Sequence, residues 1–511
     1  MELRLPRSNS KLFLVVLVAL LLRIAPLILT GMPYDNDSWY IHYDVKVLRS
    51  NPEAKILSSP AFDGYDNLWP SSVLTPYLIT LIVGKESLLA THIVGPLLDA
   101  LSIIPFYALA SRYSKKYAWL AALVVAASPG LVGIGVGLVK ETLARPLFYA
   151  TILASLRGGL IASLLLGLGL AITHHLSSLT ATLTVVLALP TAWLVKTASG
   201  SRSDTPRLGE STIILVLTVL WLTYVGLPRL KGTVSLLDPV LASLYILALT
   251  SLIAAALPLI REKPGPLAAW LPEIIVLALV AIAAVTGVPP GVQPLGISAL
   301  YYSAPFLLLP YLAVYALARI RNEPSRRHPI IPLTWLLVVS GAIAYLVFGG
   351  VPLGQSPAGR LANYLVPGAA ILYAYSGRPR LLKAKALVIL VLSILYVGAL
   401  ASNADPESYD LAYHRYEYST CKLLSSHLQA NATVYADAKM RDLLYYLGLV
   451  KTKMPLPEPG HGLLVLYKEN LVYGYKLDSN LRGGSPEKIA RLITGESLVA
   501  NNGGSWIVLI R

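Results

Sequence analysis

Two aspartates stand two residues apart, directly after the first long apolar segment of the chain. Asp35 and Asp37 belong to the stretch 31–40, at the mouth of that segment. A carboxylate pair in such a position can bind a hard divalent cation or take a proton from a hydroxyl group. A polar loop whose Asp37 or Ser38 caps a helix would contain the same residues, so the spacing alone leaves both interpretations open.

Two further short segments between apolar stretches carry ionisable side chains. Lys140 and Glu141 are adjacent in one of them, and His174 and His175 are adjacent in the other. Ionisable residues at a membrane edge are costly and often functional, although an interfacial ion pair or a histidine bonded to a carbonyl would also fit. Successive helical residues point about 100° apart, so we expect only one of the two histidines to face a shared site.

Arg360 begins another apolar segment and follows the glycine-rich stretch 349–359. That stretch is too rich in glycine to be an ordinary hairpin turn. The arginine offers five donors in a fixed planar arrangement that suits a phosphate group. An interfacial anchor would use the same residue, and that alternative stays open.

The composition requires an apolar environment for most of the surface. Hydrophobic residues make up 55% of the 511 residues and charged residues only 14%, whereas a soluble domain has about 25% charged residues. Segments of about 20 apolar residues can cross a bilayer, and their recurrence predicts about thirteen spans. These spans are expected near 11–30, 88–110, 117–137, 142–156, 158–172, 176–196, 212–228, 239–260, 268–288, 299–319, 330–348, 361–377 and 386–402.

The distribution of lysine and arginine predicts the orientation of these spans. If the N-terminus is cytoplasmic, most basic residues fall in the short cytoplasmic loops, in agreement with the positive-inside rule. The formal net charge of +15 is then an orientation signal rather than a sign of nucleic-acid binding. An odd number of spans puts the C-terminal end outside the cytoplasm. The four polar segments described above all fall on that outer side.

The C-terminal region, 403–511, has no segment long and apolar enough to span a membrane. Helical patterns alternate there with strand-like runs, and Asn501–Gly504 is a turn signal before the last run. We therefore predict an α-helical polytopic membrane domain over 1–402, with a long outer loop at 31–87, and a small extracytoplasmic α/β domain over 403–511. The single cysteine, Cys421, excludes an intrachain disulfide.

Three segments carry a family resemblance: 96–107 and 119–130, which follow the acidic outer loop, and 359–368, which contains Arg360. In this order the chain resembles the catalytic subunit of archaeal and bacterial oligosaccharyltransferases, members of the GT-C glycosyltransferase superfamily. The resemblance is clearest over about 11–180. It implies a GT-C-like fold with about thirteen spans and an outer C-terminal domain.

The resemblance also implies roles for individual residues. Asp35 or Asp37 would be the catalytic acid of the first loop, and Arg360 would lie near the donor phosphate. Glu141 would match the second acidic motif, although Lys140 stands where an acid is often found. Asp37, Glu141, His174 and His175 are the candidate ligands of a divalent metal ion, Mg2+ or Mn2+, although the resemblance itself gives no match for the histidines.

Two departures from the family pattern bear on the acceptor. The chain lacks the Trp-Trp-Asp motif that reads the peptide acceptor, since Trp506 is the only tryptophan after residue 403. The outer loop 288–298 is short and has no acid. A membrane glycosyltransferase that uses a polyprenyl (dolichyl) phosphate-linked sugar and a glycan, lipid or protein acceptor therefore fits better than transfer to a peptide.

Two alternatives stay open at this point. Many proteins with this number of spans are secondary transporters, but those place ionisable residues near the middle of broken helices. The spans here are nearly free of acids, with Glu273 as the main exception, which favours the enzyme. A non-catalytic GT-C relative is the second alternative.

Overall fold

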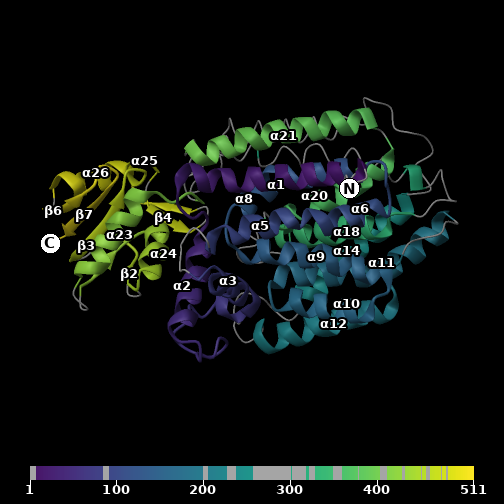
Figure 1. Cartoon of the computed structure of the whole chain (residues 1–511), viewed down its shortest axis with the longest axis horizontal. Coiled ribbons are helices and arrows are strands. Elements are labelled where there is room, and N and C mark those ends of the chain that lie inside the picture. Colours follow the sequence, from purple (N-terminus) through teal and green to yellow (C-terminus); the bar gives the residue numbers. More distant parts are fainter. Residues whose placement is uncertain are drawn as a thin grey trace, which may run out of the picture.

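The computed structural model has a long helical bundle with a strand-containing region at one end (Figure 1). It describes residues 7–84, 91–199, 205–226, 238–256, 301, 318–320, 328–348, 360–377, 379–402, 411–428, 432–449, 452–455, 461–473, 475–478, 481–495 and 497–510. The predicted span 268–288, most of 299–319, the loop 288–298 and the stretch 349–359 lie outside the described residues.

The helices of the bundle and of the first loop follow the apolar segments of the sequence. They are α1 (Arg7–Thr30), α2 (Asn36–Ser50), η1 (Asp66–Leu68), α3 (Pro70–Val83), α5 (Val94–Leu101), α6 (Ile103–Ser111), α7 (Ala118–Ala126), α8 (Pro129–Gly135), α9 (Lys140–Arg157), α10 (Leu160–Ala171), α11 (His175–Ser199), α12 (Leu208–Trp221), η2 (Leu222–Gly226), α14 (Asp238–Ala256), α18 (Ile330–Phe348), α20 (Leu365–Ser376) and α21 (Pro379–Ser402).

Five helical segments among the described residues are long and apolar enough to cross a membrane. They are Ser10–Thr30, Val94–Ser111, His175–Thr197, Leu208–Val225 and Leu382–Ser402. The pair α7 and α8 would make a sixth, bent by 59° where Pro129 begins the second helix. Several apolar helices thus make the chain a multi-pass membrane protein. The number of thirteen spans stays a prediction.

A buried ion cluster joins three helices of the bundle. The carboxylate of Asp99, on α5, accepts from the guanidinium groups of Arg23 on α1 and Arg145 on α9. Arg23 also donates to the carbonyl oxygen of Ala126, 2.8 Å away. All three ionic side chains are buried. Few acids were expected in the spans, and Asp99 was not named among them. This acid is neutralised by two arginines.

The described residues of the C-terminal region form two sheets and four helices. Its helices are α23 (Arg415–His427), α24 (Ala438–Tyr446), α25 (Asn470–Tyr473) and α26 (Pro486–Gly495), and its strands are β1 (Val434–Tyr435), β2 (Thr452–Lys453), β3 (Gly462–Tyr467), β4 (Tyr475–Asp478), β5 (Leu481–Gly483), β6 (Ser497–Asn501) and β7 (Ser505–Ile510). The main sheet has the order β2-β1-β3-β7-β6, and β4 pairs with β5. Strand β1 is parallel to β2 and β3, whereas β7 is antiparallel to β3 and β6.

Helices α23, α24 and α26 and strands β1, β3 and β7 lie where the sequence patterns predicted helices and strands, whereas α25, β2, β4, β5 and β6 were not predicted. The predicted turn joins β6 to β7, and Gly503 has a positive φ of 84° there, a conformation that favours glycine. The extent of a separate domain over 403–511 stays a prediction.

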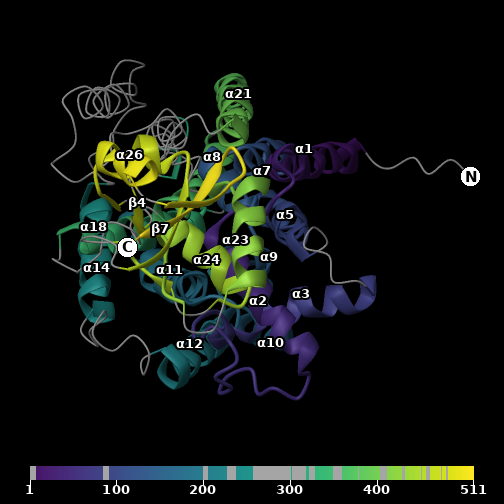
Figure 2. The same ribbon diagram turned by 90° about the vertical axis from the view of Figure 1, so that its left-hand side faces the viewer.

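The first loop packs directly on this C-terminal region. Trp39 of α2 is buried against the rings of Tyr413 and Tyr446, with ring centroids 5.2 and 5.0 Å apart. Tyr34 forms an antiparallel bridge with Ala412. Helices α2 and α3 lie beside the end of the bundle that carries the strands, and Figure 2 views the molecule from that end.

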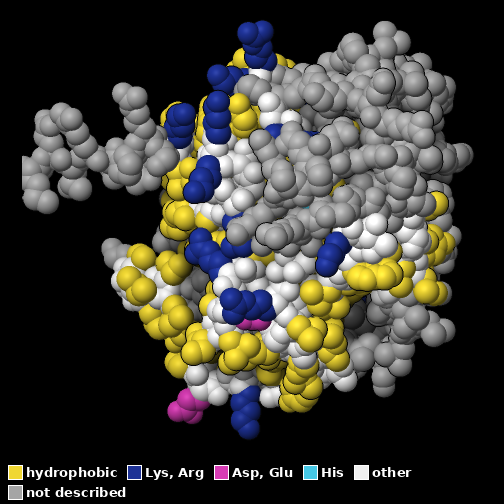
Figure 3. Space-filling model, turned by 90° about the vertical axis from the view of Figure 1, so that its right-hand side faces the viewer, with side chains coloured by type: hydrophobic (Ala, Val, Ile, Leu, Met, Phe, Trp, Pro, Cys, Tyr) yellow, Lys and Arg dark blue, Asp and Glu magenta, His cyan; other side chains and the backbone are white. Residues whose placement is uncertain are grey.

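The opposite end of the molecule has a different surface. Figure 3 shows that lysine and arginine side chains gather on this face while acidic side chains are few. Hydrophobic side chains lie along the flanks of the same view.

Candidate active site

Asp35 ends the short connection between α1 and α2 in an unusual backbone conformation. Its φ of 71° is the only positive value at a non-glycine position within the described residues, and such a residue costs about 1–3 kcal/mol. Its Oδ1 atom accepts from the backbone N–H of Asp37, 3.0 Å away, and caps α2. The alternative interpretation of this loop placed the cap at Asp37 or Ser38, whereas the capping residue is Asp35.

The start of α9 is fixed against this connection by small residues. The hydroxyl of Ser38 donates to the carbonyl oxygen of Tyr34 at 2.5 Å and accepts from the N–H of Leu138 at 2.8 Å. A side chain at Gly137 would bring its Cβ atom within 2.9 Å of the Asp35 Cβ atom. Only glycine fits there, so the backbone of α9 begins directly beside the two aspartates.

Glu141 connects the beginnings of three helical segments. Its Oε1 atom lies 3.4 Å from Nε2 of His174 and 3.4 Å from Nη1 of Arg360. The Nδ1 atom of His174 accepts from the backbone N–H of Ser177, so a neutral ring carries its proton on Nε2, facing Glu141. The side chain of Glu141 is 6% exposed and that of Arg360 is 52% exposed. Arg360 can therefore contact a ligand that comes from solvent or lipid while it stays paired with Glu141.

Lys140 faces the first loop instead. Its ammonium group forms an ion pair with Asp66 and lies 4.0 Å from Oδ2 of Asp37 and 3.9 Å from the centre of the Tyr65 ring. Burial would lower the pKa of Lys140, but Asp66 and Asp37 raise it above its ordinary value. Asp66 was not singled out in the sequence, because nothing in its spacing distinguishes it from the other acids of the loop.

The predicted metal ligands do not assemble into one set. His174 reaches Glu141, whereas the His175 ring packs on Trp69 with centroids 4.9 Å apart. This agrees with the expectation that one histidine faces the site. Asp37 faces the ammonium of Lys140 rather than a histidine. Within the described part of the chain no three His, Cys, Asp or Glu side chains are grouped as metal ligands. The residues present therefore do not fit the expected Mg2+ or Mn2+ site.

The environment of Asp35 suits a group that accepts a proton. Burial, together with the nearby charge of Asp37, raises the pKa of Asp35 to about 6, and Arg360 opposes this rise. A general base works best when its pKa lies near the working pH. Asp35, Asp37, Glu141, His174 and Arg360 thus belong to one continuous cluster.

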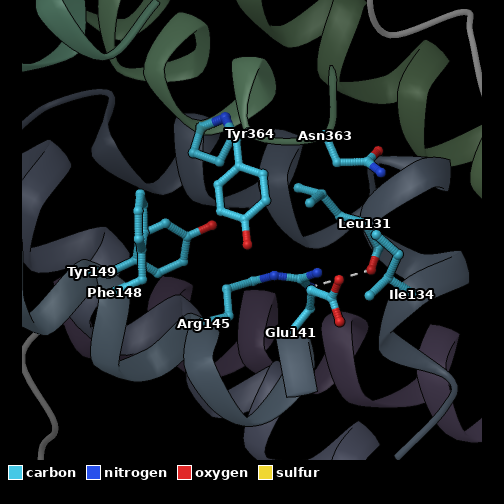
Figure 4. Close-up of a pocket in the computed structure, with 9 residues that line it drawn as sticks. Leu131, Ile134, Glu141, Arg145, Phe148, Tyr149, Asn363 and Tyr364 are labelled. Atoms are coloured by element: carbon cyan, nitrogen blue, oxygen red, sulfur yellow. Dashed lines mark hydrogen bonds between the residues drawn. The ribbon is translucent and has the colours of Figure 1, made fainter. Parts of the chain in front are cut away.

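A small cavity adjoins this cluster on the bundle side. Figure 4 shows the hydroxyl group of Tyr364 pointing toward the side chain of Arg145, and the carboxylate of Glu141 near the guanidinium end of that arginine. The cavity is lined by Leu131, Ile134, Glu141, Arg145, Phe148, Tyr149, Asn363, Tyr364 and Pro367.

Comparison with known proteins identifies the fold. A crystal structure of the Archaeoglobus fulgidus oligosaccharyltransferase, a complex with Zn and sulfate, superposes with a TM-score of 0.52 at 13% identity, covering 90% of this chain and 68% of that one. The likeness confirms the expected GT-C fold.

Two further structures resemble the chain more loosely. ArnT from Cupriavidus metallidurans, bound to undecaprenyl phosphate, has a TM-score of 0.37 at 14% identity and 98% coverage of both chains. The mycobacterial arabinofuranosyltransferase AftD has a TM-score of 0.43 at 13% identity, covering 98% of this chain and 40% of that one. No family model and no curated protein sequence matches the chain.

Proposed function

We propose that the chain is a membrane glycosyltransferase that moves a sugar from a polyprenyl (dolichyl) phosphate carrier to an acceptor on the outer face of the membrane. The observation that carries this proposal is the cluster of Asp35, Asp37, Glu141, His174 and Arg360 at one end of a GT-C fold. The acceptor class is a glycan, a lipid or a protein.

The proposed reaction uses the cluster as follows. An acceptor hydroxyl group forms a bond to the anomeric carbon of the sugar, and its proton passes to the Asp35 carboxylate. The bond between that carbon and the phosphate oxygen breaks, and the electron pair leaves with the polyprenyl phosphate. Arg360, half exposed beside Glu141, binds the phosphate oxygens through its planar guanidinium group. Asp37 orients the acceptor from the first turn of α2.

The charge distribution supports the proposed orientation. Basic side chains gather on the face away from the C-terminal strands, as expected for a cytoplasmic face. The cluster begins at the other end of α1, next to the first loop and the segment around Ala412. A lipid-linked donor would then present its phosphate at the outer edge of the bilayer.

Neutral substitutions of the two aspartates test the proposal. Asp35→Asn and Asp37→Asn should each lower sugar transfer about a hundredfold or more, while size-exclusion profiles and thermal unfolding stay close to those of the parent. Glu53→Gln, on the exposed part of the same loop, is the matched control and should keep full transfer. Full activity in both aspartate variants would remove the assigned roles.

A further inference from the structure

The ammonium group of Lys140 is enclosed by side chains of the first loop. Its relative exposure is 1%, and the side chain of Asp66 is 2% exposed. Asp66 contacts the ammonium directly, Asp37 lies 4.0 Å away, and the Tyr65 ring covers one side at 3.9 Å. A buried lysine is therefore the cation shared by two acids of this loop.

The neighbouring residue faces the other way. Glu141 is held by His174 and by Arg360, at 3.4 Å each. Lys140 and Glu141 are the first two residues of α9. The positive charge of Lys140 therefore faces the loop acids, and the negative charge of Glu141 faces His174 and Arg360. Asp37, Asp66 and Glu141 are thus each paired with a cationic or hydrogen-bonding side chain of the chain itself, whereas Asp35 accepts from the backbone N–H of Asp37.

A divalent cation would compete with this lysine for the same oxygens. Mg2+ needs carboxylate oxygens at about 2.0–2.1 Å in a nearly octahedral arrangement. To bind Asp37 and Asp66 together it would have to lie where the ammonium group now lies, and two positive charges repel each other strongly in a buried site. Lys140 therefore both neutralises the acids and excludes a metal ion from them.

We propose that the Lys140 ammonium group takes the place of a divalent metal ion in this site, so that the transfer reaction proposed above proceeds without one. Lys140 is a positioning residue: it holds Asp66 in place and also Asp37, whose backbone N–H donates to Asp35. The charge that meets the donor phosphate comes from Arg360. The part of this inference that concerns sugar transfer rests on the proposed function. The part that concerns cation binding does not.

Manganese binding tests the inference without any substrate. The purified full-length protein in detergent is titrated with Mn2+, and the loss of the free-ion signal is followed by electron paramagnetic resonance. We expect the parent to take up no Mn2+ at this site. Lys140→Gln removes the charge and should bind about one equivalent through the freed carboxylates. Lys140→Gln combined with Asp66→Asn should lose that binding again.

The control is Lys46→Gln, the same substitution at an exposed lysine of α2, which should behave like the parent. Folding of each variant is checked by thermal unfolding. One equivalent of Mn2+ bound by the parent, and lost in Asp37→Asn, would overturn the inference. A folded Lys140→Gln protein that binds no Mn2+ would also overturn it. The Mn2+ titration of the parent protein needs no variant, so it tests the inference even where a variant does not fold.

An activity measurement separates this inference from the proposed function. Sugar transfer by the parent should be unchanged by a chelator, and abolition by the chelator with rescue by Mn2+ would refute the role of Lys140. A parent protein that binds no Mn2+ and transfers no sugar would count against the proposed function. The assignment of Lys140 as the cation of this site would then still hold.

Discussion

At the scale of single residues, the sequence indicated most of the cluster but not its internal pairing. Asp37, Glu141 and His174 could be selected because ionisable side chains beside apolar segments are rare and costly. Their partners depend on helix orientation and loop path, which one sequence does not contain. Asp66 was missed for this reason, and so was the position of Lys140 between the loop acids, where its ammonium group lies among the oxygens expected to bind a metal ion.

Arg360→Lys tests the residue that we assign to the donor phosphate. Lysine keeps the charge but loses the planar pair of donors that grips a phosphate. We expect turnover to fall by about tenfold or more, with a smaller change in donor affinity if the contact strengthens as the phosphate leaves. Steady-state transfer at varied donor concentration measures both quantities. Arg157→Lys, exposed at the end of α9, is the control. Equal transfer by parent and Arg360→Lys would make the arginine a simple interfacial anchor.

At the scale of elements, the apolar segments predicted the helices well, because span length follows from the thickness of the bilayer. The spacing of apolar residues after residue 403 predicted α23, α24 and β7. The folding of the first loop over α2 could not be predicted. It depends on contacts such as that of Asp44, whose Oδ1 atom accepts from the N–H of Asp63, 2.9 Å away.

Asp44→Asn tests this attachment of the loop to α2. Burial, with a contribution from Asp63, raises the pKa of Asp44 to about 9. A folded-state pKa above the ordinary value means that the folded state binds the proton more tightly. The contribution of Asp44 to the free energy of unfolding is complete below about pH 4. It is lost, by about 1.4 kcal/mol per pH unit, as the pH rises toward 9.

Asparagine keeps the acceptor and removes the ionisation. The variant should therefore unfold at a higher temperature than the parent at pH 8.5, with the difference shrinking at pH 5. Thermal unfolding in detergent at both values measures this, and Glu53→Gln serves as the exposed control on the same loop. An identical pH dependence in the parent and Asp44→Asn would show that the buried carboxyl is not responsible.

At the scale of the whole molecule, the proposed function requires the C-terminal region to lie outside the cytoplasm. The first loop is bound to that region through Trp39 and Tyr34, so both must lie on one side of the membrane. Protease added to sealed right-side-out vesicles should cut near residue 403 and give a fragment of about 403–511 on a denaturing gel. Vesicles of the opposite orientation should protect it. Cleavage only in inside-out vesicles would place the proposed site in the wrong compartment.

The most direct test of the central claim uses the purified parent protein in liposomes with one labelled sugar supplied in two forms. We predict transfer of the label to a glycan, lipid or protein acceptor when the sugar is attached to a polyprenyl phosphate, and none when it is attached to a nucleotide. Asp35→Asn should abolish the signal. Transfer from the nucleotide form, or movement of an intact solute across the membrane without sugar transfer, would contradict the account.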